Sequence, residues 1–336
     1  MDTKALKKSL QKKQIPTTLS RITEWVSSGN KALNYVMTGD FERGIPNKRT
    51  VVFSGPSGSG KSFLLGNIAK NVQDKGYHII YIDTENAITE DFLTKIGVQM
   101  DEEHFTPIRV HSIEECQEVL SEVLSMVGDD GDKVGVFIDS LSMLEPQKTV
   151  DEFDKSGEMK ADQGRKAKML KAMVNMLNAK VSDKDMFCVM TGHVYKSQDI
   201  YSGTQYHFSG GEAIMYIPSI SVLLTKGKLK DGKEVSGIKL KAEAWKTRFF
   251  KLGTKAEIEV PYDDGMDPHS GLLEFLETEG YVRKSGAWYY YTYDDQEYKF
   301  QKNKLADHYR YLSAASQSYE PVEQEEEEDL GDTEGV

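Results

Sequence analysis

The chain has 336 residues, of which 38% are hydrophobic, and its formal net charge is −12. A chain of this length can bury a full core and carry a smaller appendage, and it contains no apolar run of about 18 residues, so we expect no membrane span. The two cysteines, Cys116 and Cys188, lie far apart and lack metal-ligand spacing, which favours a soluble protein of a reducing cytoplasm over a disulfide-bonded secreted one.

The charge is distributed unevenly along the chain. Residues 319–336 contain nine acidic and no basic residues, so the rest of the chain carries a net charge of only −3. Residues 226–255 hold ten basic and three acidic residues. Such a basic run is typical of a solvated face and also permits DNA binding, so both interpretations stay open. We expect the acidic tail to be disordered, serving either solubility or competition for basic DNA-binding groups.

The predicted elements begin with a short basic helical arm at residues 1–23. Apolar, β-branched runs then recur, with helical stretches between them. These runs are 50–54, 78–82, 108–110, 134–138, 187–191 and 220–225. Continuous apolar strands that alternate with helices are typical of a parallel sheet covered on both faces. We therefore predict a doubly wound α/β core over residues 24–265.

The pattern changes after residue 265. A short helix is expected at 270–279, a tyrosine-rich hairpin around 286–291, and a final helix near 304–312. We assign these elements, over residues 266–318, to a small carboxy-terminal α+β subdomain that precedes the tail.

A complete P-loop follows the first strand of the core and opens an amphipathic helix. It consists of Gly55, Pro56, Ser57, Gly58, Ser59, Gly60, Lys61 and Ser62. The glycines let backbone N–H groups surround a β-phosphate, Lys61 can reach the β and γ oxygens, and Ser62 offers a hydroxyl to Mg²⁺. The motif predicts ATP binding with Mg²⁺. A dinucleotide-binding loop is excluded, because Phe63 stands where that fingerprint requires glycine or alanine.

Two carboxylates follow buried strands of the predicted sheet. Asp139 ends the run at 134–138, where a P-loop protein places a second Mg²⁺ partner, held directly or through water. Glu85 lies just past the run at 78–82 and can orient or activate the attacking water. Either residue alone could be an ordinary carboxylate at a strand end, and the P-loop is what favours the catalytic interpretation.

Further motifs occur in a characteristic order. They are Ser27-Ser28-Gly29 before Leu33-Asn34-Tyr35, the P-loop, Ile82-Asp83-Thr84-Glu85 before Lys95-Ile96-Gly97-Val98, the run 136–141, Gly210-Gly211, Gly265-Met266-Asp267-Pro268, and Gly286-Ala287-Trp288-Tyr289. This order resembles that of the RecA-family recombinases, and more closely the phage UvsX type, over residues 24–312. The last motif lies outside the ATPase core, where helicases with the same core should have no counterpart. The resemblance implies an ATPase that forms a helical filament on single-stranded DNA and exchanges strands with homologous duplex.

The resemblance also implies roles for individual residues. Glu85 stands in the place of the family's catalytic glutamate, and Phe92 in that of an aromatic residue that stacks on adenine. His193 takes the place of a glutamine that senses the γ-phosphate, and histidine there matches the phage relatives. Lys246 and Arg248 resemble a basic pair that reaches the ATP of the neighbouring subunit, although RecA has two lysines at this spacing. A core role for Phe92 and ordinary surface roles for the basic pair stay open.

Two long stretches, 147–165 and 195–211, break the alternation of strands and helices and resemble the DNA-binding loops of the family. Basic groups there can track phosphates while aromatic rings pack on bases, and such loops commonly order only on binding. The residues that we assign to DNA contacts are Lys155, Lys160, Arg165, Lys196, Tyr201, Tyr206, Phe208, Gly210 and Gly211.

Two rival functions remain at this point: a hexameric helicase with the same core, and a non-catalytic ATP-dependent regulator or scaffold. For a recombinase, we expect single-stranded and homologous duplex DNA, further copies of the chain, and single-strand-binding and loader proteins as partners, with no membrane. Residues 1–23 would dock on the adjacent protomer. The place of action would be the cytoplasm, that of a bacterial host if the source is a phage.

Overall fold

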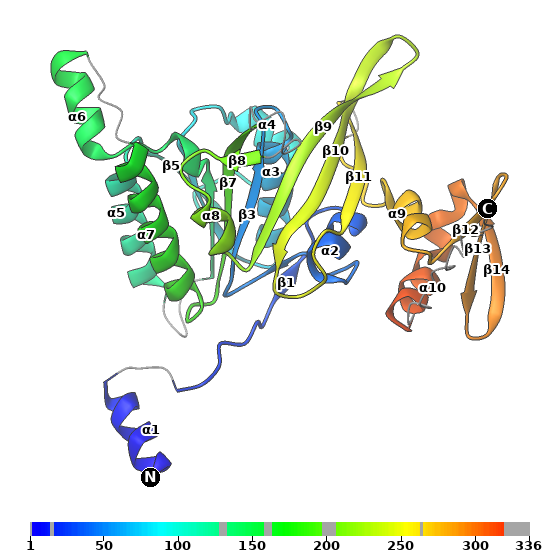
Figure 1. Ribbon diagram of the computed structural model, residues 1–336, viewed down its shortest axis with the longest axis horizontal. Coiled ribbons are helices and arrows are strands. Elements are labelled where there is room, and N and C mark those ends of the chain that lie inside the picture. Colours follow the sequence, from blue (N-terminus) through cyan, green and yellow to red (C-terminus); the bar gives the residue numbers. More distant parts are fainter. Residues whose placement is uncertain are drawn as a thin grey trace, which may run out of the picture. The chain divides into compact units, whose positions relative to one another are not determined.

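The computed structural model describes residues 2–13, 17–127, 133–157, 163–196, 206–262 and 265–318 (Figure 1). The chain divides into two compact units, Met1–Phe275 and Leu276–Val336. The second unit begins later than the subdomain expected at 266–318. The acidic tail expected at 319–336 lies outside the described residues.

A nine-stranded sheet forms the centre of the first unit, in the order β11-β10-β9-β3-β7-β6-β4-β5, with β8 paired to β7. The strands are β3 (Thr50–Gly55), β4 (His78–Asp83), β5 (Phe105–Arg109), β6 (Val134–Asp139), β7 (Met186–Lys196), β8 (Tyr206–Phe208), β9 (Ile220–Asp231), β10 (Glu234–Thr247) and β11 (Lys255–Pro261). Neighbours from β9 through β5 pair in parallel, whereas β10 and β11 extend the sheet with antiparallel pairs. This sheet confirms the predicted α/β fold.

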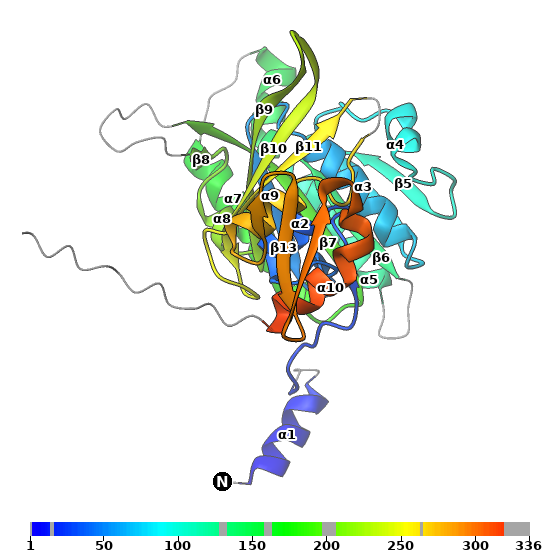
Figure 2. The same ribbon diagram turned by 90° about the vertical axis from the view of Figure 1, so that its right-hand side faces the viewer.

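Helices cover both faces of the sheet (Figures 1 and 2). On one face lie α3 (Lys61–Gln73) and α4 (Glu90–Ile96), and on the other lie α5 (Ile113–Met126), α7 (Gln163–Val181) and the short α8 (Ala213–Tyr216). Alternate residues of β6 supply both cores, because Phe137 packs with the α3 side chains while Val136 and Ile138 pack with those of α5 and α7. A strand buried on both faces therefore reads as a continuous apolar run.

Five further elements of the first unit precede the P-loop or follow β11. They are α1 (Thr3–Lys12), β1 (Trp25–Val26), α2 (Lys31–Thr38), β2 (Ile45–Pro46) and α9 (Leu272–Thr278), whose last residues belong to the second unit. Asn30 caps α2 by accepting a hydrogen bond from the Leu33 N–H, and Gly39 ends it in the left-handed conformation at φ 75°.

The second unit contains a three-stranded sheet and a helix. Its strands are β12 (Arg283–Ser285), β13 (Trp288–Tyr293) and β14 (Gln296–Gln301), and the turn η2 (Lys302–Lys304) leads into α10 (Leu305–Ser318). Tyr289, Tyr291 and Phe300 are buried, and His308 of α10 stacks on Phe300 with ring centroids 4.8 Å apart. The tyrosine-rich stretch is thus part of a small aromatic core.

The stretch 147–165 corrects our expectation of a loop. The turn η1 (Leu141–Met143) leads to the helix α6 (Gln147–Ser156), and α7 begins at Gln163. Pro146 precedes α6, and Gly157 ends it in the left-handed conformation at φ 69°. Only Thr149 of α6 is buried, and Val150 and Phe153 are the only large apolar side chains of this short helix. None of the helices in the described parts of the chain is long and apolar enough to cross a membrane.

Candidate nucleotide-binding site

The P-loop connects the end of β3 to the start of α3. Gly58 and Gly60 adopt the left-handed conformation, at φ 68° and 85°, which favours glycine at both positions. Lys61 is the first residue of α3, and its Nζ donates to the carbonyl oxygens of Gly55 and Pro56, at 3.0 Å each. Burial lowers the pKa of Lys61. The loop thus combines a helix amino terminus with a largely desolvated ammonium group, which is a strong anion-binding arrangement.

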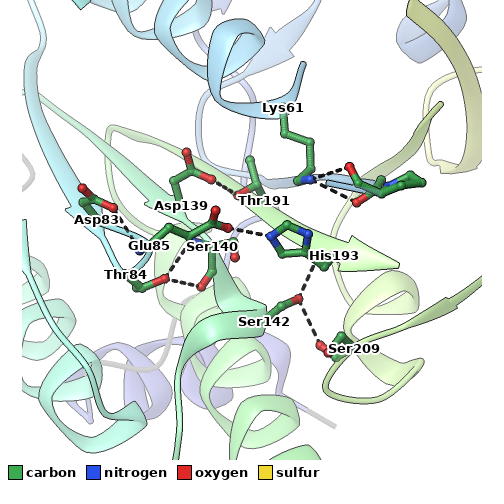
Figure 3. Close-up of polar contacts among 12 residues, drawn as sticks. Lys61, Asp83, Thr84, Glu85, Asp139, Ser140, Ser142, Thr191, His193 and Ser209 are labelled. Carbon is green, nitrogen blue, oxygen red and sulfur yellow. Dashed lines mark hydrogen bonds and ion pairs between the residues drawn. The ribbon is translucent and has the colours of Figure 1, made fainter. Parts of the chain in front are cut away.

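Asp139 lies at the end of β6, and both of its carboxylate oxygens accept hydrogen bonds. Figure 3 shows the bond from Thr191. Asp139 Oδ1 accepts a hydrogen bond from Thr191 Oγ1 at 2.5 Å, and Asp139 Oδ2 accepts one from the Tyr81 hydroxyl at 3.0 Å. Neither supporting residue was identified from the sequence. Tyr81 did carry a signal, because a tyrosine in a fully buried apolar strand must find a partner for its hydroxyl.

Thr84 ties the end of β4 to the end of β6. Its Oγ1 accepts from the Ser140 N–H at 2.8 Å and donates to the Ser140 carbonyl at 2.7 Å, while its own N–H donates to the Asp139 carbonyl at 2.8 Å. These bonds fix the two strand ends, which carry Glu85 and Asp139, relative to each other.

Glu85 contacts His193 directly, with 2.7 Å between Oε1 and Nε2 (Figure 3). The turn that presents Glu85 is held by Asp83, whose Oδ1 accepts from the backbone N–H groups of Glu85 and Asn86. The hydrogen bond from His193 lowers the pKa of Glu85 to about 2, against the opposing effect of burial and with help from the charge of Lys61. Glu85 is therefore an ionised, weakly basic carboxylate at neutral pH, suited to orienting a water molecule.

A short chain of hydrogen bonds links His193 to the end of the second predicted loop. The His193 N–H donates to Ser142 Oγ at 2.8 Å, and this hydroxyl donates to the Ser209 carbonyl at 3.1 Å. The Ser209 N–H in turn donates to the His193 carbonyl at 2.9 Å. Gly210 and Gly211 follow directly, with φ of 114° and 104°.

Phe208 corrects our assignment of a DNA contact. Its ring is buried and lies against Gly192, where the Cβ of any other residue would come 2.0 Å from the ring carbon Cζ. The ring fixes β8 to β7 one residue from His193. Phe208 therefore belongs to the core in this structure and presents no face to a base.

The other residues assigned to DNA contacts are scattered over several elements. Lys155 in the last turn of α6 and Lys196 at the end of β7 are exposed. Arg165 in α7 is half-buried, and so is Tyr206, whose ring lies 6.4 Å from that of Trp245. Lys160 and Tyr201 lie outside the described residues. DNA contact by these residues remains a prediction.

Phe92 is half-buried on α4 and packs against the hydrophobic cluster on the α3 face of the sheet. Phe92 thus contributes to the edge of the core, and its contact with adenine stays a prediction.

Lys246 and Arg248 are remote from the P-loop of their own chain. Lys246 Nζ donates to the carbonyls of Tyr216 and Ile217, which precede β9, and the pKa of Lys246 is lowered first by burial and then by the charge of Arg248. These contacts lie at the amino-terminal edge of the parallel strands, whereas the P-loop lies at the carboxyl-terminal edge. The six residues of β3 span about 17 Å, which separates the pair from the P-loop of the same chain.

The residues at the P-loop fit a nucleotide and its metal ion. Ser59 Oγ is buried and lacks a hydrogen-bond partner within the part of the chain that the structure describes, as a group reserved for a ligand would. The Ser62 hydroxyl and the Asp139 carboxylate are oxygen ligands of the kind that Mg²⁺ prefers. These two residues would hold the ion, which would neutralise charge on the phosphates.

The chain is similar in sequence to known proteins. Residues 6–267 match the RecA N-terminal domain. A recombination and repair protein of Enterobacteria phage T4 is 30% identical over 271 residues, which are 80% of this chain and 66% of that protein. Protein RecA of Streptomyces rimosus is 26% identical, and the match covers 75% of this chain and 64% of that protein. Protein RecA of Thioalkalivibrio sulfidiphilus is 25% identical, and the match covers 82% of this chain and 77% of that protein. The match thus spans slightly less than two thirds of the first two relatives.

Proposed function

The chain belongs to the RecA family, and we propose that it is an ATP-dependent DNA recombinase. It would assemble as a helical filament on single-stranded DNA, pair that strand with homologous duplex and exchange strands, in recombination, repair and recombination-dependent replication. The observation that carries this proposal is the meeting of Lys61, Glu85, Asp139 and His193 at the carboxyl ends of four adjacent strands, β3, β4, β6 and β7.

The catalytic part of the proposal assigns a role to each of these groups. Lys61 and the P-loop amides bind the phosphates, Ser62 and Asp139 hold Mg²⁺, and Glu85 orients the attacking water. Thr191 and Tyr81 fix the Asp139 carboxylate, so that little reorganisation is needed when the ion binds.

The link from ATP to DNA would run through His193. In the structure its Nε2 contacts Glu85, and its backbone is bonded to Ser142 and Ser209 at the end of the loop 195–211. A γ-phosphate that draws His193 away from Glu85 would move this loop end and favour the DNA-binding arrangement, a population shift driven by nucleotide state. The shift ends when the γ-phosphate is lost.

The oligomeric part of the proposal rests on Lys246 and Arg248. Because these residues face away from their own P-loop, ATP would lie between subunits and receive their charge from the neighbour, as in an arginine-finger arrangement. A head-to-tail contact of this kind generates a helix unless it closes into a ring. The amphipathic α1, which exposes Leu6, supports the further proposal that residues 1–23 dock on the next protomer.

The first experiment is the steady-state ATPase rate with and without single-stranded DNA, with Lys61→Ala as the control. We expect strong stimulation by DNA that the substitution abolishes, followed by strand exchange in a joint-molecule assay. ATP binding without any stimulation by DNA would contradict the proposal.

A hexameric helicase is the main rival, since it would share the ATPase core. The second unit, with its three-stranded sheet around Gly286–Tyr289, favours the recombinase because a helicase core does not require it. Electron microscopy of the ATP-bound protein on single-stranded DNA separates the two functions, since we expect open filaments rather than closed rings.

A non-catalytic regulator or scaffold is the second rival. The ionised Glu85 beside His193 favours hydrolysis, because a protein that only binds ATP needs no group to orient water. Glu85→Gln should abolish turnover while leaving filament formation intact. A scaffold would keep its whole activity in this variant.

A further inference from the structure

The lysines on the two faces of the β9–β10 hairpin differ in their ion pairs. On one face, Lys239 lies 3.5 Å from Glu257 and 3.0 Å from Glu259, and Lys241 lies 2.8 Å from Glu257. The opposite face carries Lys226, Lys228 and Lys230, all exposed. For these three, no carboxylate of the described residues lies within ion-pair distance. The second set of charges is therefore available to an external anion.

The face with the unpaired lysines also covers the P-loop. Strand pairing places Lys226 opposite Leu240. The methyl groups of Ile238 and Leu240 lie 3.2 and 3.7 Å from the position that a Cβ would take at Gly60. Lys226 Nζ lies 2.5 Å from the equivalent position at Gly58. The ammonium group thus rests directly on the backbone of the phosphate-binding loop, and it can do so because Gly58 has no side chain.

The positive charge of Lys226 also acts on Lys61. Burial is the main cause that lowers the pKa of Lys61, and the positive charge of Lys226 acts in the same direction. Two ammonium groups at one loop repel each other until an anion of high charge lies near both. Glu85 and Asp139 each raise the pKa of Lys61 more than Lys226 lowers it, so burial is what keeps this pKa low.

We propose that Lys226 is a second phosphate-binding lysine of the P-loop, supplied by the β9–β10 hairpin of the same chain. The inference rests on the proposed function in that the anion is the triphosphate of ATP. Lysine suits the task because it is a compact charge with three donors on a flexible stem, which can move from the backbone of Gly58 to a phosphate oxygen. Its contribution grows with the charge of the ligand, so ATP gains more than ADP.

The test is a fluorescence titration with a labelled ATP analogue and with labelled ADP, in the absence of DNA, at two salt concentrations. Lys226→Met keeps the unbranched stem of the side chain, one atom shorter, and removes the charge. We expect about fivefold weaker binding of the ATP analogue, a smaller loss for ADP, and a shallower dependence on salt. Lys226→Arg should restore most of the affinity. Lys230→Met is the matched control, since it removes the same charge from the same face farther from the P-loop, and it should bind both nucleotides like wild type.

Three outcomes would count against the inference. Wild-type affinity in Lys226→Met overturns it, and so does an equal loss in Lys226→Met and Lys230→Met, because a general surface potential then accounts for the effect. A loss that Lys226→Arg fails to restore points to packing rather than charge, and overturns it as well. If wild type itself binds no nucleotide, the proposed function fails rather than the role of Lys226 alone. Thermal unfolding of each variant shows that the fold is retained.

Discussion

Tyr81, on the neighbouring strand β4, fixes the orientation of the Asp139 carboxylate. Its ring lies between Phe105 and Phe137, with centroids 5.9 and 6.4 Å away, and its hydroxyl donates to Asp139 Oδ2. The ring is fixed by packing and the hydroxyl by a charged acceptor, so the carboxylate has little freedom to rotate. If Asp139 holds Mg²⁺ as we propose, Tyr81 would orient this ligand without touching the ion.

Tyr81→Phe should therefore remove the hydrogen bond that orients the Asp139 carboxylate and keep the packing of the ring. The ring stays in place, so we expect a loss of about 1 kcal/mol in stability and a weaker dependence of nucleotide binding on Mg²⁺. Tyr77→Phe is a matched control, because its buried hydroxyl also donates to a carboxylate, that of Asp185 at 2.9 Å, away from the P-loop. The control should lose similar stability in urea unfolding and keep the Mg²⁺ dependence of wild type. Identical Mg²⁺ titrations for both variants would refute the role of Tyr81.

The contact between Glu85 and His193 predicts a dependence of stability on pH. The pKa of Glu85 falls from its ordinary value of 4.5 in the unfolded chain to about 2 in the folded protein. The stabilisation is thus fully present above pH 4.5 and is lost as the pH falls toward 2. Glu85→Gln should be less stable than wild type by about 1 kcal/mol at pH 7, with a difference that shrinks toward pH 3. Urea unfolding between pH 3 and 7 measures it, and parallel curves for the two proteins would contradict the effect.

At the scale of elements, the strand β8 and the turn after it connect His193 to the end of the loop 195–211 and would transmit the proposed change at the nucleotide site. Phe208 holds β8 on Gly192, and Ser209 is bonded to both His193 and Ser142. The end of the loop 195–211 therefore has a hydrophobic anchor and a polar one, both within one residue of the candidate γ-phosphate sensor.

Phe208→Ala should abolish the coupling between the nucleotide site and the proposed DNA-binding loop 195–211. Removing the buried ring costs about 3 kcal/mol in stability and frees β8 from β7. We expect a variant that binds ATP normally but no longer tightens its grip on single-stranded DNA when ATP is added, as measured by fluorescence anisotropy. Phe300→Ala, which removes a buried ring in the second unit, should keep the tightening. Normal ATP-dependent tightening in Phe208→Ala would show that the anchor carries no signal.

Some of these elements and site residues could be predicted from the sequence, and others could not. The P-loop, β6 and β7 were predictable because parallel strands buried on both faces form continuous apolar runs, and Glu85 and Asp139 follow from their positions at strand ends. Phe208 was misassigned because an aromatic residue in a glycine-rich stretch looks like a loop residue, and only the missing Cβ of Gly192 shows where the ring fits. Thr84 and Thr191 gave no signal, since their bonds join strands that are distant in sequence.

At the scale of the whole molecule, the P-loop and Lys246, which we propose to act on one ATP molecule, lie at opposite edges of the parallel strands. The P-loop and Glu85 lie at the carboxyl-terminal edge of the parallel strands, and Lys246 with its α8 contacts lies at the amino-terminal edge. A monomer would therefore be a poor ATPase, and activity should rise with the protein concentration that drives assembly. DNA would stimulate hydrolysis by aligning subunits so that these edges meet.

Mixing two inactive variants tests this arrangement. Glu85→Gln lacks the group that orients water but keeps Lys246, whereas Lys246→Met keeps Glu85 and lacks the charge offered to the neighbour. Neither variant alone should turn over ATP at a measurable rate. In an equimolar mixture on single-stranded DNA, random head-to-tail contacts complete about a quarter of the interfaces, so we expect a corresponding fraction of the wild-type rate. Lys230→Met mixed with Glu85→Gln controls for dilution, because its interfaces are already complete. If the mixture of the two inactive variants stays inactive while both still join filaments, Lys246 does not act across the interface, and the head-to-tail placement of ATP between subunits must be abandoned.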